Sequence, residues 1–206
     1  MNRFLPIVLA LFLVLAAQTV TAAPKPPRPT AGIGVLLVRP FPEFSTLEAT
    51  VIKLFHEPGV GREVEVAAGS VHLLAPILGR SAVEAQLAVT ERREGWMRVV
   101  YDDAGREGWV GLERCWCFVE CEYYLKGKSA QLLPGLRKPY YQLLREPYEF
   151  AAAEKTLTAT DIFRVIGLEG DWALVLAGVE KVGWLRWRDR DGRFTVAVGD
   201  GVRKKR

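Results

Sequence analysis

The densest group of reactive side chains is a run of three cysteines, Cys115, Cys117 and Cys121. If this stretch is a strand, Cys115 and Cys117 point the same way, but the two-residue ring that a bridge would close is strained. A bridge between Cys117 and Cys121 needs only a turn or coil between them. We therefore expect a disulfide involving Cys121 first, a free buried thiol second and an intermolecular link third. An odd number of cysteines leaves at least one unpaired within the chain.

Few residues of the chain could support metal binding or catalysis. The two histidines, His56 and His72, lie in turn-like segments, and neither lies near the cysteines to complete a metal site. Residues 79–83 miss the Gly-x-Ser-x-Gly nucleophile elbow at their last position. We predict no catalytic residues, no metal and no cofactor.

Two pairs of aspartates have the residue type that a two-carboxylate glycosidase needs, and residue type alone does not exclude that chemistry. Both pairs lie beside expected turns, where Asp stabilises the local backbone. They are Asp102 with Asp103 and Asp189 with Asp191.

The composition favours short strands joined by turns. The chain has 206 residues, of which 50% are hydrophobic and 25% charged, with 19 Gly and 12 Pro. The formal net charge of +4 is modest, and the one basic cluster is at residues 203–206. Because no basic stripe interleaves with aromatic residues, we expect no nucleic-acid partner.

The N-terminus predicts export. One positive charge at Arg3 precedes an apolar run over residues 4–17, and Val20-Thr21-Ala22 fits the small-residue pattern before a cleavage site. The apolar run is nearer the ~7–15 residues of a signal peptide core than the ~20 of a membrane span. An uncleaved anchor is the alternative, and it is the only membrane attachment that we expect.

A Pro-rich segment follows over residues 23–33. Its alternating prolines predict an extended polyproline-type spacer, and it matches P-x-x-P twice, at Pro24/Pro27 and Pro26/Pro29. We favour a stalk. The alternative is a self-ligand for a groove on the same or a neighbouring molecule.

The rest of the chain contains one unit twice. A β-run over residues 96–101, a turn and Gly108-Trp109-Val110 form an expected hairpin, which recurs as residues 170–178 and Gly183-Trp184-Leu185. The offset between copies is 76 residues at Trp96/Trp172 but 89 at Glu57/Glu146, so the first copy carries about 13 extra residues. Within residues 60–82, positions 63–68 fit either a strand or a short helical turn in an inserted loop.

This repeated order of β-run, turn, β-run and Gly-Trp resembles the bacterial SH3 family over residues 50–119 and 140–190. The resemblance implies an all-β fold of two tandem small SH3-like β-barrels, the first with an inserted loop, after a signal peptide and Pro-rich spacer. The expected organisation is a signal peptide at 1–22, the Pro-rich linker at 23–33, SH3-like domain 1 at 34–122, a connector at 123–139, SH3-like domain 2 at 140–199 and a basic tail at 200–206.

Strand parity assigns the faces of the hairpins. Met97, Val99 and Tyr101 share one face, and Trp96, Arg98 and Val100 share the other, which Arg98 indicates is the wetter face. Trp96 and Trp172 are then placed to flank a groove, as aromatic residues do in peptide-binding barrels. The alternative for each tryptophan is that it caps a small core. The candidate ligand-binding residues are Trp96, Tyr101, Trp109, Trp172, Trp184 and Trp187.

The resemblance also implies a function. SH3-like modules of this kind bind peptides or cell-wall polymers, are often appended to wall hydrolases and have no catalytic residues of their own. We expect a non-catalytic, periplasmic binding or scaffolding protein that recognises peptide or peptidoglycan-derived ligands. The alternatives are an accessory or targeting subunit for a separate envelope hydrolase and, third, a small wall-cleaving enzyme. Related wall peptidases use Cys followed by His, whereas both histidines here precede every cysteine.

Overall fold

A computed structural model describes residues 28–41 and 46–198 of the chain. The predicted signal peptide at 1–22, the first part of the predicted linker at 23–27 and the predicted basic tail at 200–206 lie outside these residues. The protein is 48% strand and 10% helix, which confirms the all-β prediction. Within the described ranges, no helix is long and apolar enough to cross a membrane.

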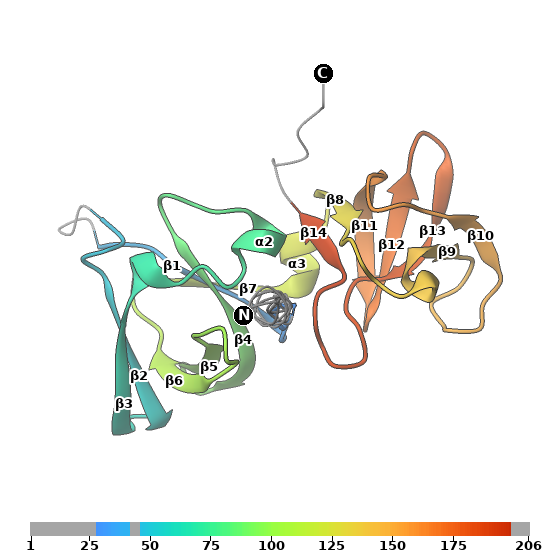
Figure 1. The fold of residues 1–206 in the computed structure, drawn as a ribbon. Coiled ribbons are helices and arrows are strands. Elements are labelled where there is room, and N and C mark those ends of the chain that lie inside the picture. Colours follow the sequence, from blue (N-terminus) through green and yellow to red (C-terminus); the bar gives the residue numbers. More distant parts are fainter. Residues whose placement is uncertain (1–27, 42–45, 199–206) are drawn as a thin grey trace, which may run out of the picture.

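The first of two antiparallel sheets has seven strands in the order β3-β2-β6-β5-β4-β1-β7 (Figure 1). They are β1 (Gly34–Val38), β2 (Val51–Glu57), β3 (Val60–Ala67), β4 (Ala85–Arg93), β5 (Trp96–Val100), β6 (Glu107–Gly111) and β7 (Cys117–Glu120).

The second sheet has the order β10-β9-β13-β12-β11-β8-β14, so its seven strands follow the same path as those of the first. They are β8 (Ser129–Leu132), β9 (Gln142–Leu144), β10 (Ala153–Thr156), β11 (Ile162–Glu169), β12 (Trp172–Ala177), β13 (Lys181–Arg186) and β14 (Val196–Val198). The first of these, β8, lies within the predicted connector and yet is a strand of this sheet. The short helices are η1 (Ala68–Ser70), α2 (Ala75–Leu78), α3 (Cys121–Leu125) and η2 (Lys138–Tyr141).

The two sheets also share their register around the tryptophans. Trp109 of β6 pairs with Phe55 of β2, and Trp184 of β13 pairs with Leu144 of β9. These partners are 89 residues apart and the tryptophans 75 apart, as in the sequence repeat. The internal repeat is therefore a repeat of strand order and pairing.

Neither sheet closes into a barrel among the described residues, so the prediction of closed SH3-like barrels is not confirmed. Strands β3 and β10 pair only with β2 and β9, and strands β7 and β14 pair only with β1 and β8. Closure is one way to protect sheet edges, and short edge strands are another. Three of these four edge strands have only three or four residues, β7, β10 and β14.

A glycine before the repeated tryptophan lets neighbouring strands approach closely. A Cβ added at Gly108 would lie 3.1 Å from the Cβ of Leu54, and one added at Gly183 would lie 2.6 Å from the Cγ of Leu143. Both leucines are fully buried in the cores of their sheets. The Gly-Trp pairs of the sequence thus mark where the hairpin packs against β2 or β9.

All five residues of β1 are buried, so this apolar run is covered on both faces of the strand. Leu36 and Val38 belong to the core of the first sheet. Val35 and Leu37 belong to the cluster that includes the core of the second sheet. A strand covered on both faces has a continuous rather than alternating hydrophobic pattern. The two units therefore share an apolar interface.

The extra residues of the first copy help to build that interface. Residues 60–67 form strand β3, and the extra length lies in residues 68–84, which contain η1 and α2. Ile77 and Leu78 of α2 lie in the same cluster as Val196 and Val198 of β14. Figure 1 shows α2 and α3 between the two sheets, beside β14.

The described part of the Pro-rich linker is attached to the second unit. The amide of Phe194 donates to the carbonyl of Pro29 (3.1 Å), and the amide of Ala31 donates to the carbonyl of Gly192 (2.8 Å). Arg28 forms an ion pair with the buried Asp189. Residues 28–31 therefore pair with another part of the same molecule, whereas Pro24, Pro26 and Pro27 of the P-x-x-P matches lie outside the described residues.

Candidate functional site

The six predicted ligand-binding aromatics do not line one groove. Trp96, Trp172 and Trp184 are partly exposed. Trp109 is only 2% exposed. Tyr101 and Trp187 are buried in the two cores at 6% and 2% exposure.

Strand parity is confirmed in both copies. Met97 and Val99 point into the first core, whereas Trp96 and Arg98 lie on the outer face of that sheet. In the second copy the same alternation runs along β12, with Ala173, Val175 and Ala177 buried and Trp172, Leu174 and Leu176 partly exposed.

The first outer face groups Phe55, Trp96, Trp109 and Arg93, which we call the first aromatic face. The ring of Phe55 meets Trp96 edge to face, with 5.4 Å between centroids. The guanidinium of Arg93 lies 4.9 Å from the centre of the Trp109 ring and also donates to Glu91 (2.7 Å). Arg93 and its neighbours thus cover Trp109, and Trp96 is the ring that remains accessible.

The second outer face groups Trp172, Leu174, Trp184 and Arg186, which we call the second aromatic face. The guanidinium of Arg186 lies 4.8 Å from the centre of the Trp172 ring. Leu174 pairs with Trp184 across the hairpin, and both are partly exposed. Each unit therefore presents an accessible tryptophan beside an arginine, an arrangement suited to stacking against a ligand.

Two predicted ligand residues have structural roles instead. The indole nitrogen of Trp187 donates to the carbonyl of Gly170 (2.9 Å), and its ring lies 5.8 Å from that of Phe194. Tyr101 packs in the core of the first sheet. The alternative that a tryptophan caps a core fits the burial of Trp187.

All three cysteines are free thiols, so the predicted bridge between Cys117 and Cys121 is not present. Cys117 is exposed on β7, whereas Cys121 is buried and its thiol donates to the carbonyl of Ala31 (3.6 Å). Burial raises the pKa of the Cys121 thiol to about 11. Cys121 is thus the free buried thiol of the second alternative.

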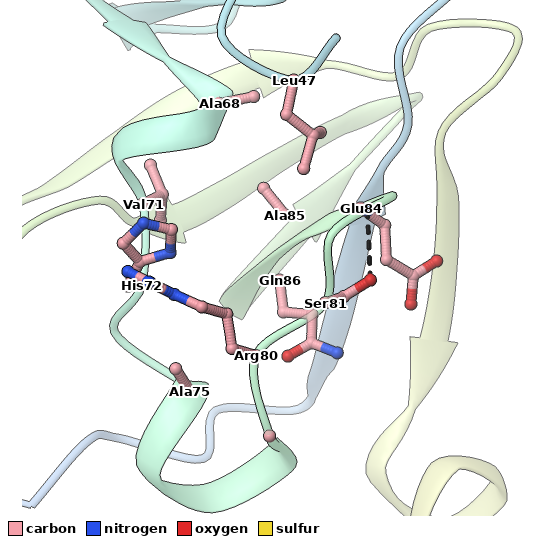
Figure 2. A pocket seen from close by; sticks show the side chains of 11 residues that line it. Leu47, Ala68, Val71, His72, Ala75, Arg80, Ser81, Glu84, Ala85 and Gln86 are labelled. Atoms are coloured by element: carbon pink, nitrogen blue, oxygen red, sulfur yellow. Dashed lines mark hydrogen bonds between the residues drawn. The ribbon is translucent and has the colours of Figure 1, made fainter.

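A small cavity beside α2 contains the side chains that could suggest hydrolytic chemistry, His72, Ser81 and Glu84 (Figure 2). Its volume of about 10 Å³ holds roughly one water. The Ser81 hydroxyl accepts hydrogen bonds from the amides of Val83 and Glu84, both at 3.2 Å. This serine caps a turn, and the cavity has no room for a substrate. Among the described residues, no three His, Cys, Asp or Glu side chains group as metal ligands.

A larger cleft of about 340 Å³ lies between the two units, and we call it the interunit cleft. Its first wall comes from the residues before β1 and from β4, β7 and α3. Its second wall comes from the end of β11, the β11–β12 turn and the residues after β13. It is lined by Gly32, Ile33, Arg92, Phe118, Glu120, Cys121, Glu122, Leu168, Gly170, Trp187 and Arg188.

Stacked arginines stand on both walls of the interunit cleft. Arg92 lies 4.4 Å from the centre of the Phe118 ring, and Arg188 lies 5.0 Å from the centre of the Trp187 ring. Sequence reasoning missed this cleft because neither copy contains it alone. The one local signal was Gly32-Ile33-Gly34, whose glycines allow close packing at this point.

Comparisons with protein-family models and with curated proteins find no match to this chain.

Proposed function

We propose that this protein is a non-catalytic binding or scaffolding protein of the bacterial envelope, built from two tandem SH3-like modules. The observation that carries the proposal is the repetition of an accessible tryptophan at the same register position on the outer face of both sheets. Trp96 and Trp172 each begin the first strand of a hairpin, which is the central strand of its sheet. Each pairs with the end of the returning strand, at Gly111 and Arg186.

The proposed ligand is a peptide or a peptidoglycan-derived polymer that contacts both aromatic faces. Flat rings beside arginines favour ligands with apolar faces and negative or polar groups. Two weak sites on one chain also raise the overall affinity for a repetitive polymer, because the second contact becomes intramolecular. The predicted signal peptide at residues 1–22 would deliver the protein to the periplasm, where such polymers lie.

Sedimentation with insoluble peptidoglycan tests this proposal. We expect the full chain to pellet with the polymer, and the double variant Trp96→Ala/Trp172→Ala to lose about tenfold or more in apparent affinity, as exposed aromatic anchors do. Tyr123→Ala removes another exposed ring, on α3, and should not change binding. Circular dichroism of each variant separates lost binding from lost folding.

Two outcomes would contradict the proposal. If the folded double variant pellets as well as the native chain, the tryptophans do not form the binding surface. If the purified protein releases soluble fragments from wall material, it is not a non-catalytic protein. Co-purification of a stoichiometric hydrolase from envelope extract would instead support the accessory-subunit alternative.

A further inference from the structure

We propose that the interunit cleft is a second binding site, for a short peptide that carries both a free carboxylate and a free ammonium group. This site is separate from the two aromatic faces, and its ligand does not depend on the function proposed for them. The proposal rests on the volume of the cleft and on the charges of Arg92, Glu120 and Glu122, which form no ion pair among the described residues.

The size of the cleft suits a small ligand. Its volume of about 340 Å³ falls within the ~300–1,000 Å³ that is usual for small-molecule sites, and such sites often lie between domains. The cavity in Figure 2 is far smaller, at about 10 Å³.

Arg92 is placed as a carboxylate receptor. Its guanidinium carbon lies over the Phe118 ring, and within the described part of the chain its N–H groups donate no side-chain hydrogen bond, so they are available to a ligand. Among the described residues Arg92 forms no ion pair, although Arg93 and Arg98 on neighbouring positions both do. A guanidinium fork held in place by an aromatic ring matches the two oxygens of a carboxylate.

The position of that arginine is built into the backbone. Phe118 lies directly over Gly34, where an added Cβ would come within 2.5 Å of the ring. Gly34 pairs with Glu120 and Leu36 pairs with Phe118 across β1 and β7. The glycine thus makes room for the ring, and the ring holds Arg92 at the rim of the cleft.

The second arginine of the cleft is already engaged. Arg188 pairs with Asp171 and donates to the carbonyl of Gly32 (2.9 Å). Because Gly32 precedes β1 of the first sheet, this bond joins the two walls. Arg188 therefore holds the cleft together, and Arg92 is the arginine whose donors are available to a ligand.

Glu120 and Glu122 supply the opposite charge. Both are exposed, and neither forms an ion pair among the residues that the structure describes. The Cys121 thiol between them is neutral at pH 7, because burial raises its pKa to about 11. A simple anion would meet Arg92 but also two carboxylates, whereas a ligand with both charges complements both groups. Ile33 and Leu168 add apolar surface for an aliphatic side chain.

Titration of the full, isotope-labelled chain with the tripeptide Ala-Leu-Ala, followed by NMR, tests this site. The matched probes are its N-acetylated form, which lacks the ammonium, and its C-amidated form, which lacks the carboxylate. We expect shifts of the amides of Ile33, Leu168 and Gly170, and about tenfold weaker binding of each blocked peptide, the size of one lost bond to a charged group. Equal binding of all three peptides, or shifts confined to the two aromatic faces, would overturn the proposal.

Variants assign the two charges. Arg92→Gln should abolish the preference for the free acid over the amide, and Glu120→Gln/Glu122→Gln should abolish the preference for the free amine over the acetylated form. Arg137→Gln, an exposed arginine outside the cleft, should change neither. If Arg92→Gln keeps the preference for the free acid, Arg92 is not the receptor. If a variant does not fold, the three peptides on the native chain still decide the question.

Discussion

Replacement of Gly183 by alanine should destabilise the second sheet by a steric clash. The added Cβ would lie 2.6 Å from the Cγ of Leu143 and 2.9 Å from the carbonyl oxygen of Leu144. Leu143 is fully buried, so it cannot swing away, and the carbonyl belongs to the backbone of β9. Overpacking of this kind costs typically ~1–3 kcal/mol. We expect a loss near the upper end, about 3 kcal/mol, because one of the two clashing atoms is backbone.

Two other glycines serve as matched controls. At Gly108, the equivalent position in the first sheet, the nearest atom to an added Cβ is the Cβ of Leu54 at 3.1 Å, and the three closest atoms all belong to that one side chain. These separations are longer than those at Gly183, and no backbone atom is among the three closest, so Gly108→Ala should cost about 1 kcal/mol. At Gly167 an added Cβ meets nothing within 4 Å. Gly167→Ala should therefore stabilise the protein by ~0.4–1 kcal/mol through the unfolded chain.

Urea unfolding of the three variants measures this order, with hydrogen exchange of the β9 and β13 amides reporting on the second sheet. We expect Gly167→Ala to be more stable than the native protein, Gly108→Ala to be less stable than the native protein, and Gly183→Ala to be the least stable of all. The reasoning would be refuted if Gly183→Ala were as stable as the native protein, or if Gly108→Ala were the more damaging of the pair.

Two further predictions concern the turn at Asp189, which binds Arg28 of the linker, and the buried thiol. Asp189→Ala should cost about 3 kcal/mol or more, because its carboxylate accepts from the amides of Asp191 (3.0 Å) and Arg193 (2.9 Å), each such bond being worth ~1.5–3 kcal/mol. Asp189→Asn keeps an acceptor and should cost less in urea unfolding; equal losses would contradict this. Cys117 should react with iodoacetamide at pH 8 while Cys121 does not, as mass spectrometry can show. The folded pKa of Cys121, about 11, exceeds its usual 9.0, so its contribution to stability should be complete below pH 9 and lost towards pH 11. Cys121→Ala should remove that pH dependence.

The sequence was sufficient for the features that depend on local spacing. Alternation along Trp96–Val100 and Trp172–Ala177 predicted strands and assigned their faces, because successive side chains on a strand point to opposite sides. The shrinking offset between the copies located the extra residues of the first unit. These properties need only a few neighbouring residues, and the structure confirms the faces and the all-β class.

Local sequence patterns did not predict which individual aromatic residues are buried. Trp96 and Trp109 lie on one face of the first sheet, yet Trp109 is covered by Arg93, which comes from another strand. Trp187 comes soon after the accessible Trp184 in the same copy of the repeat, yet it is buried and its ring packs against that of Phe194. Which ring stays accessible depends on side chains brought over it from elsewhere in the chain.

The contact between the two units was decided by tertiary structure alone. Arg92 and Arg188 are 96 residues apart in the chain and meet at one cleft only because residues 28–33 and the inserted helix α2 join the sheets. A repeat in the sequence describes each copy separately, since period and spacing are properties of a continuous segment. The cleft is a property of two segments packed together, and so the residues that line it carry no common pattern.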